Sequence, residues 1–125
     1  MKPQEWRRSL GRRGEGLATT YLEKKGYLIL QRNYRGGGGE MDIVAQEGDC
    51  LVFVEVRTRS TREYGTPEES ITPSKAQRLI EVAQGYLQEQ GESGREWRID
   101  LVAIHWSGDS YWVNHIVNAV TGDGL

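Results

Sequence analysis

The sequence is short of the residues that build several common kinds of site. Cys50 is its single cysteine, so the chain can form no intramolecular disulfide, and a cysteine-based zinc site would lack ligands. We therefore expect a reducing, cytoplasmic environment. No apolar run approaches the roughly 18 residues of a membrane-spanning helix. The opening residues, MKPQEWRRSLGRRGEG, carry charges where a signal peptide needs its apolar core. These absences predict a protein with no membrane segment.

Length and charge set further limits. The 125 residues suffice for one hydrophobic core and are too few for two, so we expect a single domain over 1–125. The formal net charge is -2, but residues 1–35 hold nine Lys and Arg against three Glu. A basic segment of this kind can offer one face to a polyanion. The solvated side of a single helix would have the same composition, so both interpretations stay open.

Hydrophobic periodicity predicts seven elements. A helix is predicted over 3–25, with Gly26 as the C′ residue that ends it. A second helix is predicted to begin at Pro73 after the N-cap Thr72, and to end at Gly91. Five strands are predicted at 27–34, 40–46, 51–59, 97–106 and 111–117, with a loop over 60–71. The order α-β-β-β-α-β-β predicts an α/β fold, a mixed sheet with helices packed on it.

Glycines are informative in two parts of the sequence. The run at 36–39 precedes a strand and lacks the lysine of a nucleotide-phosphate loop, so it is interpreted as a hairpin turn. Gly11, Gly14 and Gly16 lie inside the first predicted helix, where each costs roughly 1 kcal/mol relative to alanine. Such a cost indicates that something approaches this backbone closely. A sheet or a phosphate chain would satisfy that requirement.

Acidic residues stand inside two consecutive apolar strands. Alternation puts Glu40, Asp42 and Val44 on one face of the second strand and Met41, Ile43 and Ala45 on the other. In the third strand Glu55 lies beside Arg57, opposite a row of valines. A four-residue loop at 47–50 would put Asp42 directly across from Glu55, and a two-residue loop would make them diagonal neighbours. The two carboxylates would repel unless a cation, a shared proton or Arg57 compensates, and a hard divalent metal fits best.

These residues carry a resemblance. An acid, about a dozen residues, and then acid-x-Lys on the next strand is the pattern of the PD-(D/E)XK nuclease superfamily, and Asp42 followed after twelve residues by Glu55-Val56-Arg57 resembles it. More specifically, the chain resembles the YraN-like family of small uncharacterised proteins, which are similar to Holliday-junction resolvases of archaea. The matching segments are GEGLATTYLEKKGYLIL, RNYR, GEMDIVA, LVFVEVRTR, YGTPEESITPSKAQRL, RIDLVAI and NHIVNAV. The resemblance implies a restriction-endonuclease-like core and a metal-dependent phosphodiesterase ancestry.

A phosphodiesterase site of this kind needs a metal and an activated water. Mg²⁺, or Mn²⁺ in its place, prefers oxygen ligands and keeps several waters. Asp42, Glu55 and the carbonyl of Val56 are the predicted ligands. By analogy with junction resolvases, Glu15 on the first helix would complete or orient the coordination shell, although most helix glutamates are simply solvated.

Arg57 departs from the superfamily pattern, which has lysine there. Arginine stays charged and cannot act as a general base. It can still hold a phosphate or stabilise a transition state electrostatically. Lys75 lies near the start of the second helix, and a helix N-terminus with a cation is suited to bind phosphate. Lys75 would therefore partly replace the missing superfamily lysine, or would simply be a solvated side chain of the first turn.

The sequence therefore predicts a metal-dependent endonuclease-like protein acting on DNA phosphodiesters, including branched or structured DNA, with Asp42, Glu55, Arg57 and Glu15 as its catalytic residues. Backbone-phosphate contacts are predicted at Lys75, Arg59, Arg35, Arg12 and Arg13. A homodimer would suit a substrate with two scissile strands. Two alternatives stay open. One is a nucleic-acid-binding module of the same fold that lost hydrolysis through Arg57, and the other is a protein-interaction domain in which the acids pair with arginines.

Overall fold

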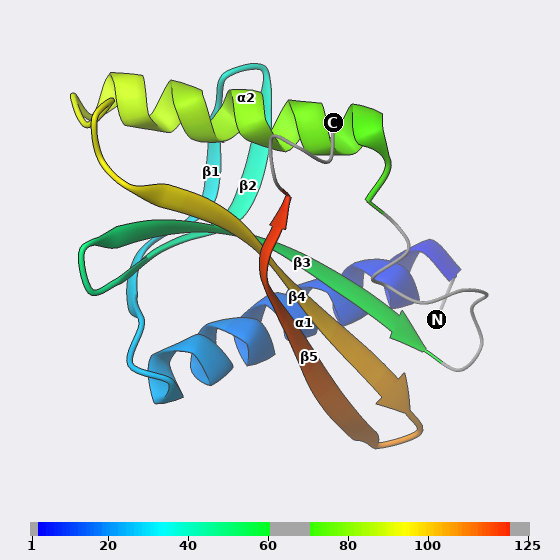
Figure 1. The fold of residues 1–125 in the computed structure, drawn as a ribbon. Helices are drawn as coiled ribbons and strands as arrows, with labels where there is room; N and C mark the ends of the chain where they lie inside the picture. Colours follow the sequence, from blue (N-terminus) through cyan, green and yellow to red (C-terminus); the bar gives the residue numbers. More distant parts are fainter. Residues whose placement is uncertain (1–2, 61–70, 121–125) are drawn as a thin grey trace.

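The computed structural model describes residues 3–60 and 71–120, with side chains over 11–60 and 71–120. Its elements are α1 (Pro3–Lys24), β1 (Leu28–Gly36), β2 (Gly39–Glu47), β3 (Cys50–Ser60), α2 (Pro73–Glu89), β4 (Trp97–Ser107) and β5 (Ser110–Val120). The strands form one sheet in the order β1-β2-β3-β4-β5, parallel between β3 and β4 and antiparallel elsewhere (Figure 1). The predicted α/β order and mixed sheet are confirmed, and both are consistent with a restriction-endonuclease-like core. The predicted loop falls almost entirely outside the described residues.

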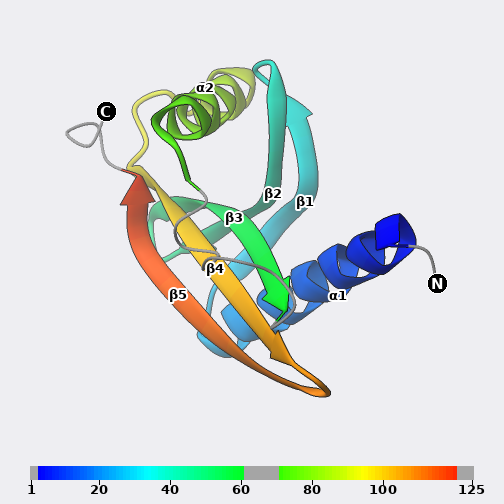
Figure 2. The ribbon, with the colours of Figure 1, turned by 90° about the vertical axis from the view of Figure 1, so that its right-hand side faces the viewer.

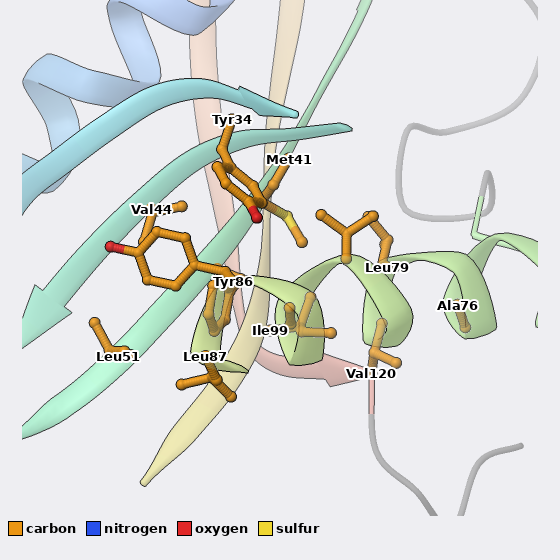
Figure 3. Close-up of a cluster of buried hydrophobic side chains, with 13 residues drawn as sticks. Tyr34, Met41, Val44, Leu51, Ala76, Leu79, Tyr86, Leu87, Ile99 and Val120 are labelled. Carbon is orange, nitrogen blue, oxygen red and sulfur yellow. The ribbon is translucent and has the colours of Figure 1, made fainter. Parts of the chain in front are cut away.

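The two helices cover opposite faces of the sheet, as the two ribbon views show (Figures 1 and 2). On one face α2 packs on a buried cluster that includes Tyr34, Phe53, Leu79 and Ile99 (Figure 3). On the other face α1 packs on a second cluster, which includes Leu22 and the inner valines of β3. The alternating pattern of β3 is thus divided between two cores. Neither described helix is long and apolar enough to cross a membrane.

Local signals set the helix ends as the sequence predicts. Gly26 follows α1 with a φ of +92°, and the next amide, of Tyr27, donates to the Leu22 carbonyl. Thr72 caps α2 by accepting a 3.1 Å hydrogen bond from the Lys75 amide on its Oγ1. A capped helix N-terminus beside the sheet fixes where the first turn of α2 lies.

The glycine run forms the tip of the β1–β2 hairpin. Gly37 and Gly38 are the two turn residues, with φ of +60° and +86°, a conformation that other residues rarely adopt. The tip rests on α2, because a Cβ at Gly37 would lie 2.7 Å from the Glu81 carbonyl oxygen. The hairpin interpretation is confirmed, and the run is also a packing surface.

The β2–β3 register brings the acids opposite each other. Ile43 pairs with Val54, and Glu47 pairs with Cys50. The turn therefore has two residues rather than the four at 47–50, yet it keeps the register in which Asp42 comes next opposite Glu55. A two-residue turn was one of the two loop lengths that the sequence left open, but here it occurs with the register expected for the four-residue loop, because pairing continues one step further toward the turn.

The strict alternation predicted for β2 is wrong at Met41. Met41 and Val44 both join the α2 cluster, whereas Ile43 joins the α1 cluster. The pleat breaks at Asp42, opposite Asn33, whose φ of +54° takes it out of extended conformation. The pairing of β1 with β2 omits this one position.

Candidate active site

The half-buried Asp42 and the buried Glu55 form an acid pair where β2 and β3 meet. The Asp42 Oδ2 atom accepts a 2.7 Å hydrogen bond from the Val56 amide. Glu55 is only 5% exposed, and the two carboxyl groups share a hydrogen bond. Two carboxyl groups can share one only when a proton lies between them, because ionised carboxylates accept and do not donate.

Burial and the neighbouring acid raise the pKa of Asp42 to about 8. Burial is the largest cause, followed by the hydrogen bond and the charge of Glu55. The Val56 amide acts in the opposite direction, and the charge of Glu15 adds a smaller increase. At neutral pH the pair therefore keeps a proton that a cation could displace.

Two cations from different elements approach Glu55. Arg57 Nη2 on β3 lies 3.3 Å from Glu55 Oε2, and Lys75 Nζ on α2 lies 3.2 Å from the same oxygen. Within the described residues, neither contact has the geometry of a hydrogen bond, so the buried Oε2 has no donor. The buried Nε of Arg57 likewise has no acceptor there. Orphaned buried atoms are costly, so a site with one free acceptor and one free donor is suited to a ligand that supplies both.

Glu15 lies on α1, at the other face of the sheet, and acts on the acid pair through its charge. Its carboxylate contributes to the raised pKa of Asp42 and lies 3.9 Å from Arg32 Nη2. The close approach of α1 that the glycines predicted occurs at Gly14, where a Cβ would collide with Thr58 of β3. Gly11 and Gly16 have open space instead.

The two predicted carboxylate ligands are of the type that Mg²⁺ prefers. Over 11–60 and 71–120, no group of three or more His, Cys, Asp or Glu side chains is placed to hold a metal. Mg²⁺ needs only one or two carboxylates, because it retains several waters. Glu55 Oε2, which has no hydrogen-bond donor among the described residues, and Asp42, once its proton is displaced, could supply such oxygen ligands. Val56 contributes its amide to Asp42, and a ligating role for its carbonyl stays a prediction.

The five predicted phosphate contacts do not form one surface. Arg35 lies on β1, where its Nε is 3.8 Å from Glu40, and it shares a cleft with Lys75. Arg12 and Arg13 are on α1, at the opposite face of the sheet, and Arg13 stacks over the Trp106 ring at 4.6 Å. The side chain of Arg59 at the end of β3 donates to the Thr58 carbonyl.

Two charged residues that sequence reasoning missed are prominent. Arg78 lines the cleft with Arg35 and Lys75, and its position three residues after Lys75 was an available signal. Asp100 is fully buried on β4, where His115 Nε2 lies 2.8 Å from its Oδ2. No spacing rule links Asp100 to His115, because the β4–β5 pairing alone brings them together.

Comparison with known proteins places these residues in a family context. The family model described as Uncharacterised protein family UPF0102 matches residues 14–104. A UPF0102 protein of Geobacter metallireducens is 44% identical over 112 residues, covering 90% of this chain and 92% of its own. A UPF0102 protein of Carboxydothermus hydrogenoformans is 44% identical over 114 residues, covering 91% and 97%. One from Pelotomaculum thermopropionicum is 51% identical over 98 residues, covering 78% and 82%.

Proposed function

The chain belongs to the UPF0102 family, and we propose that it is a metal-dependent endonuclease-like protein that acts on DNA phosphodiesters, including those of branched DNA. The observation that carries the proposal is a pair of buried atoms at the acid pair that have no hydrogen-bond partner among the described residues. Glu55 Oε2 has no hydrogen-bond donor and Arg57 Nε has no acceptor among the described residues. A metal cation and a phosphate oxygen together would satisfy both atoms.

The side chains have separable roles in this proposal. Asp42 and Glu55 hold the metal, and Arg57 binds the scissile phosphate, where its permanent charge stabilises the negative charge that develops during reaction. When bound, Mg²⁺ or Mn²⁺ supplies charge neutralisation and lowers the pKa of a bound water. Glu15 adds negative charge from α1 and favours cation binding.

Lys75 supplies the amine that the third strand lacks. Its Nζ lies 3.2 Å from Glu55 Oε2, although its backbone is on α2. An amine can release a proton and orient a water, whereas the guanidinium of Arg57 cannot release one at ordinary pH. In the proposal Lys75 therefore takes the part of the superfamily lysine from a different element.

A cleavage panel tests the proposal. Linear, flapped and four-way DNA would be incubated with Mg²⁺ and with Mn²⁺, and products separated on denaturing gels. We expect cleavage by the wild-type protein and a loss of at least about 100-fold in Asp42→Asn and Glu55→Gln. Glu23→Gln, which removes an exposed acid on α1, is the matched control and should cleave normally. Equal cleavage by all four proteins would refute the site assignment.

A DNA-binding module without turnover is the second candidate. It is favoured by Arg57, which stands 3.3 Å from Glu55 and keeps a fixed charge where hydrolysis usually employs lysine. This function predicts salt-sensitive DNA binding with no metal-dependent cleavage in the panel. Arg57→Lys would then restore cleavage, because lysine recovers a proton that can be released.

A further inference from the structure

A cleft of about 420 Å³ lies between the tip of the β1–β2 hairpin and the first turns of α2. Its lining residues are Arg35, Gly38, Gly39, Glu40, Lys75 and Arg78. Three of them are cations, one is an acid, and none has an aromatic ring. Lys75 also contacts Glu55 of the acid pair, so the cleft and the candidate active site share a residue.

Glycine fixes the wall of this cleft. A Cβ at Gly39 would lie 2.9 Å from Val82 Cγ2, and an ideal Cβ built at Gly85 would lie 3.1 Å from the Gly37 backbone. Side chains at these positions would push the hairpin tip away from α2. The glycines therefore keep β1 close to the helix, so that Arg35 lies across the cleft from the cations of α2.

Two of the three cations of the cleft, Arg35 and Arg78, are weakly compensated among the described residues. The Arg35–Glu40 pair is 3.8 Å apart and largely exposed, so it contributes little. Arg78 is exposed and has no ion pair or hydrogen bond with any described residue. A guanidinium with no such partner among the described residues, beside a second arginine and a lysine, is well suited to bidentate binding of phosphate.

We propose that this cleft binds the DNA backbone phosphate adjacent to the one held at the acid pair, with Arg78 as its main ligand and Arg35 opposite. The inference rests on the proposed function and deepens it. Lys75 and Arg78 are three residues apart on α2, which puts their Cβ atoms about 5–6 Å apart, roughly one backbone step of a nucleic acid strand. The absence of aromatic rings from the lining favours a phosphate over a stacked base.

Salt dependence of DNA binding tests the cleft without requiring cleavage. Fluorescence anisotropy would measure the dissociation constant of the full chain for a four-way DNA in EDTA, from about 50 to 300 mM NaCl. Loss of one phosphate contact lowers the slope of log K against log salt by about one unit. We expect this decrease in Arg78→Gln. Lys24→Gln removes one exposed cation from the last turn of α1, outside the cleft, and should keep more of the slope.

The outcomes separate the cleft from the nuclease. A salt slope that decreases in Arg78→Gln and not in Lys24→Gln supports phosphate binding in the cleft. This holds even if neither variant nor the wild-type protein cleaves DNA, in which case only the proposed function fails. Cleavage that depends on Asp42, together with equal slopes in Arg78→Gln and Lys24→Gln, overturns the cleft and leaves the nuclease. Inorganic phosphate would also be compared with NaCl of equal ionic strength as a competitor of DNA. If phosphate displaces DNA better than NaCl does, and this advantage is lost in Arg78→Gln, the proposal is overturned, because the cleft would then bind free phosphate.

Discussion

Asp42 combines three properties that each depend on its exact place in β2. The pleat breaks at this residue, its Oδ2 accepts from the Val56 amide at 2.7 Å, and it shares a proton with Glu55. Burial and the adjacent acid raise its pKa from 3.8 to about 8. A carboxyl group so placed lowers the stability of the fold above its unfolded pKa, and a pKa perturbed in this way is typical of functional carboxylates.

Asp42→Asn should stabilise the metal-free protein at alkaline pH. Between pH 4 and 8 the unfolded chain releases the Asp42 proton while the folded chain keeps it, so the wild-type unfolding free energy falls as pH rises. An asparagine does not titrate, and its amide can donate to Glu55 in place of the proton. We expect the variant to gain at least about 1 kcal/mol over wild type at pH 8 relative to pH 4.

Urea unfolding in EDTA at several pH values would measure this difference. Glu23→Gln is the control, because that glutamate is exposed on α1. If the stability curves of Asp42→Asn and wild type run parallel from pH 4 to 9, the shared-proton account of the acid pair is wrong.

At the scale of the element, α1 is a helix with one glycine that packs and two that do not. Gly14 faces Thr58, and this contact lets α1 lie close to the β3–β4 pair and carry Glu15 toward Asp42. A Cβ at Gly11 or Gly16 would meet no atom of the described residues within 4 Å. The sequence pattern alone treats the three alike, so only the packing separates them.

Alanine substitutions in α1 should therefore have opposite signs. Gly16→Ala should raise the unfolding free energy by about 0.5–1 kcal/mol, because alanine is the better helix former and the space is open. Gly14→Ala should lower it by about 1–3 kcal/mol, because its Cβ overlaps the Thr58 methyl. Thr58→Ser removes that methyl and should rescue part of the loss. Denaturant unfolding of the three variants would measure these changes. A neutral or stabilising Gly14→Ala would contradict the close packing of Gly14 against Thr58.

At the scale of the whole molecule, a network of charged and hydrogen-bonded side chains around the buried Asp100 joins segments that are distant in the sequence. Asp100 on β4 lies 3.0 Å from Arg98 Nε and accepts from the backbone amide of Asn118 on β5. Arg98 in turn donates to the hydroxyl of Tyr27, which precedes β1. Burial alone would raise the pKa of Asp100, but hydrogen bonds from His115, Arg98 and Asn118 lower it overall.

Asp100→Asn should destabilise the fold by about 3 kcal/mol at pH 7, because Arg98 loses its buried counter-charge and His115 loses its carboxylate hydrogen-bond partner. A carboxyl with a depressed pKa contributes stability above its unfolded pKa, near 3.8, and that contribution is lost as pH falls through its lower folded pKa. The difference between variant and wild type should accordingly shrink in acid.

Thermal and urea unfolding at pH 7 and at about pH 3 would measure this change. Asp49→Asn, at an exposed turn, is the matched control and should be close to neutral at both pH values. A constant difference between Asp100→Asn and wild type at the two pH values would count against an ionised Asp100 in the network.

The candidate site could be predicted where it depends on local periodicity and register. Pairing between β2 and β3 follows from their alternating patterns and a short turn, so Asp42 and Glu55 could be placed together. The break in alternation at Asp42 could not be predicted, because no pattern within β2 marks it; across the sheet, Asn33 on β1 has a φ of +54°. Arg78 was missed for a related reason. The cleft it lines forms only when a hairpin nearly forty residues earlier in the chain rests on α2.

The sequence by itself determined the seven elements, the α-β-β-β-α-β-β order and the meeting of two acids, because short-range patterns and pleat parity govern these features. The tertiary structure alone decided which cations reach those acids. Lys75 follows Glu55 by twenty residues, and the docking of α2 on the sheet brings its amine to within 3.2 Å of Glu55. The docking of the two helices depends on two buried clusters, one on each face of the sheet. The side chains of each cluster come from distant parts of the chain, and no local pattern specifies such contacts.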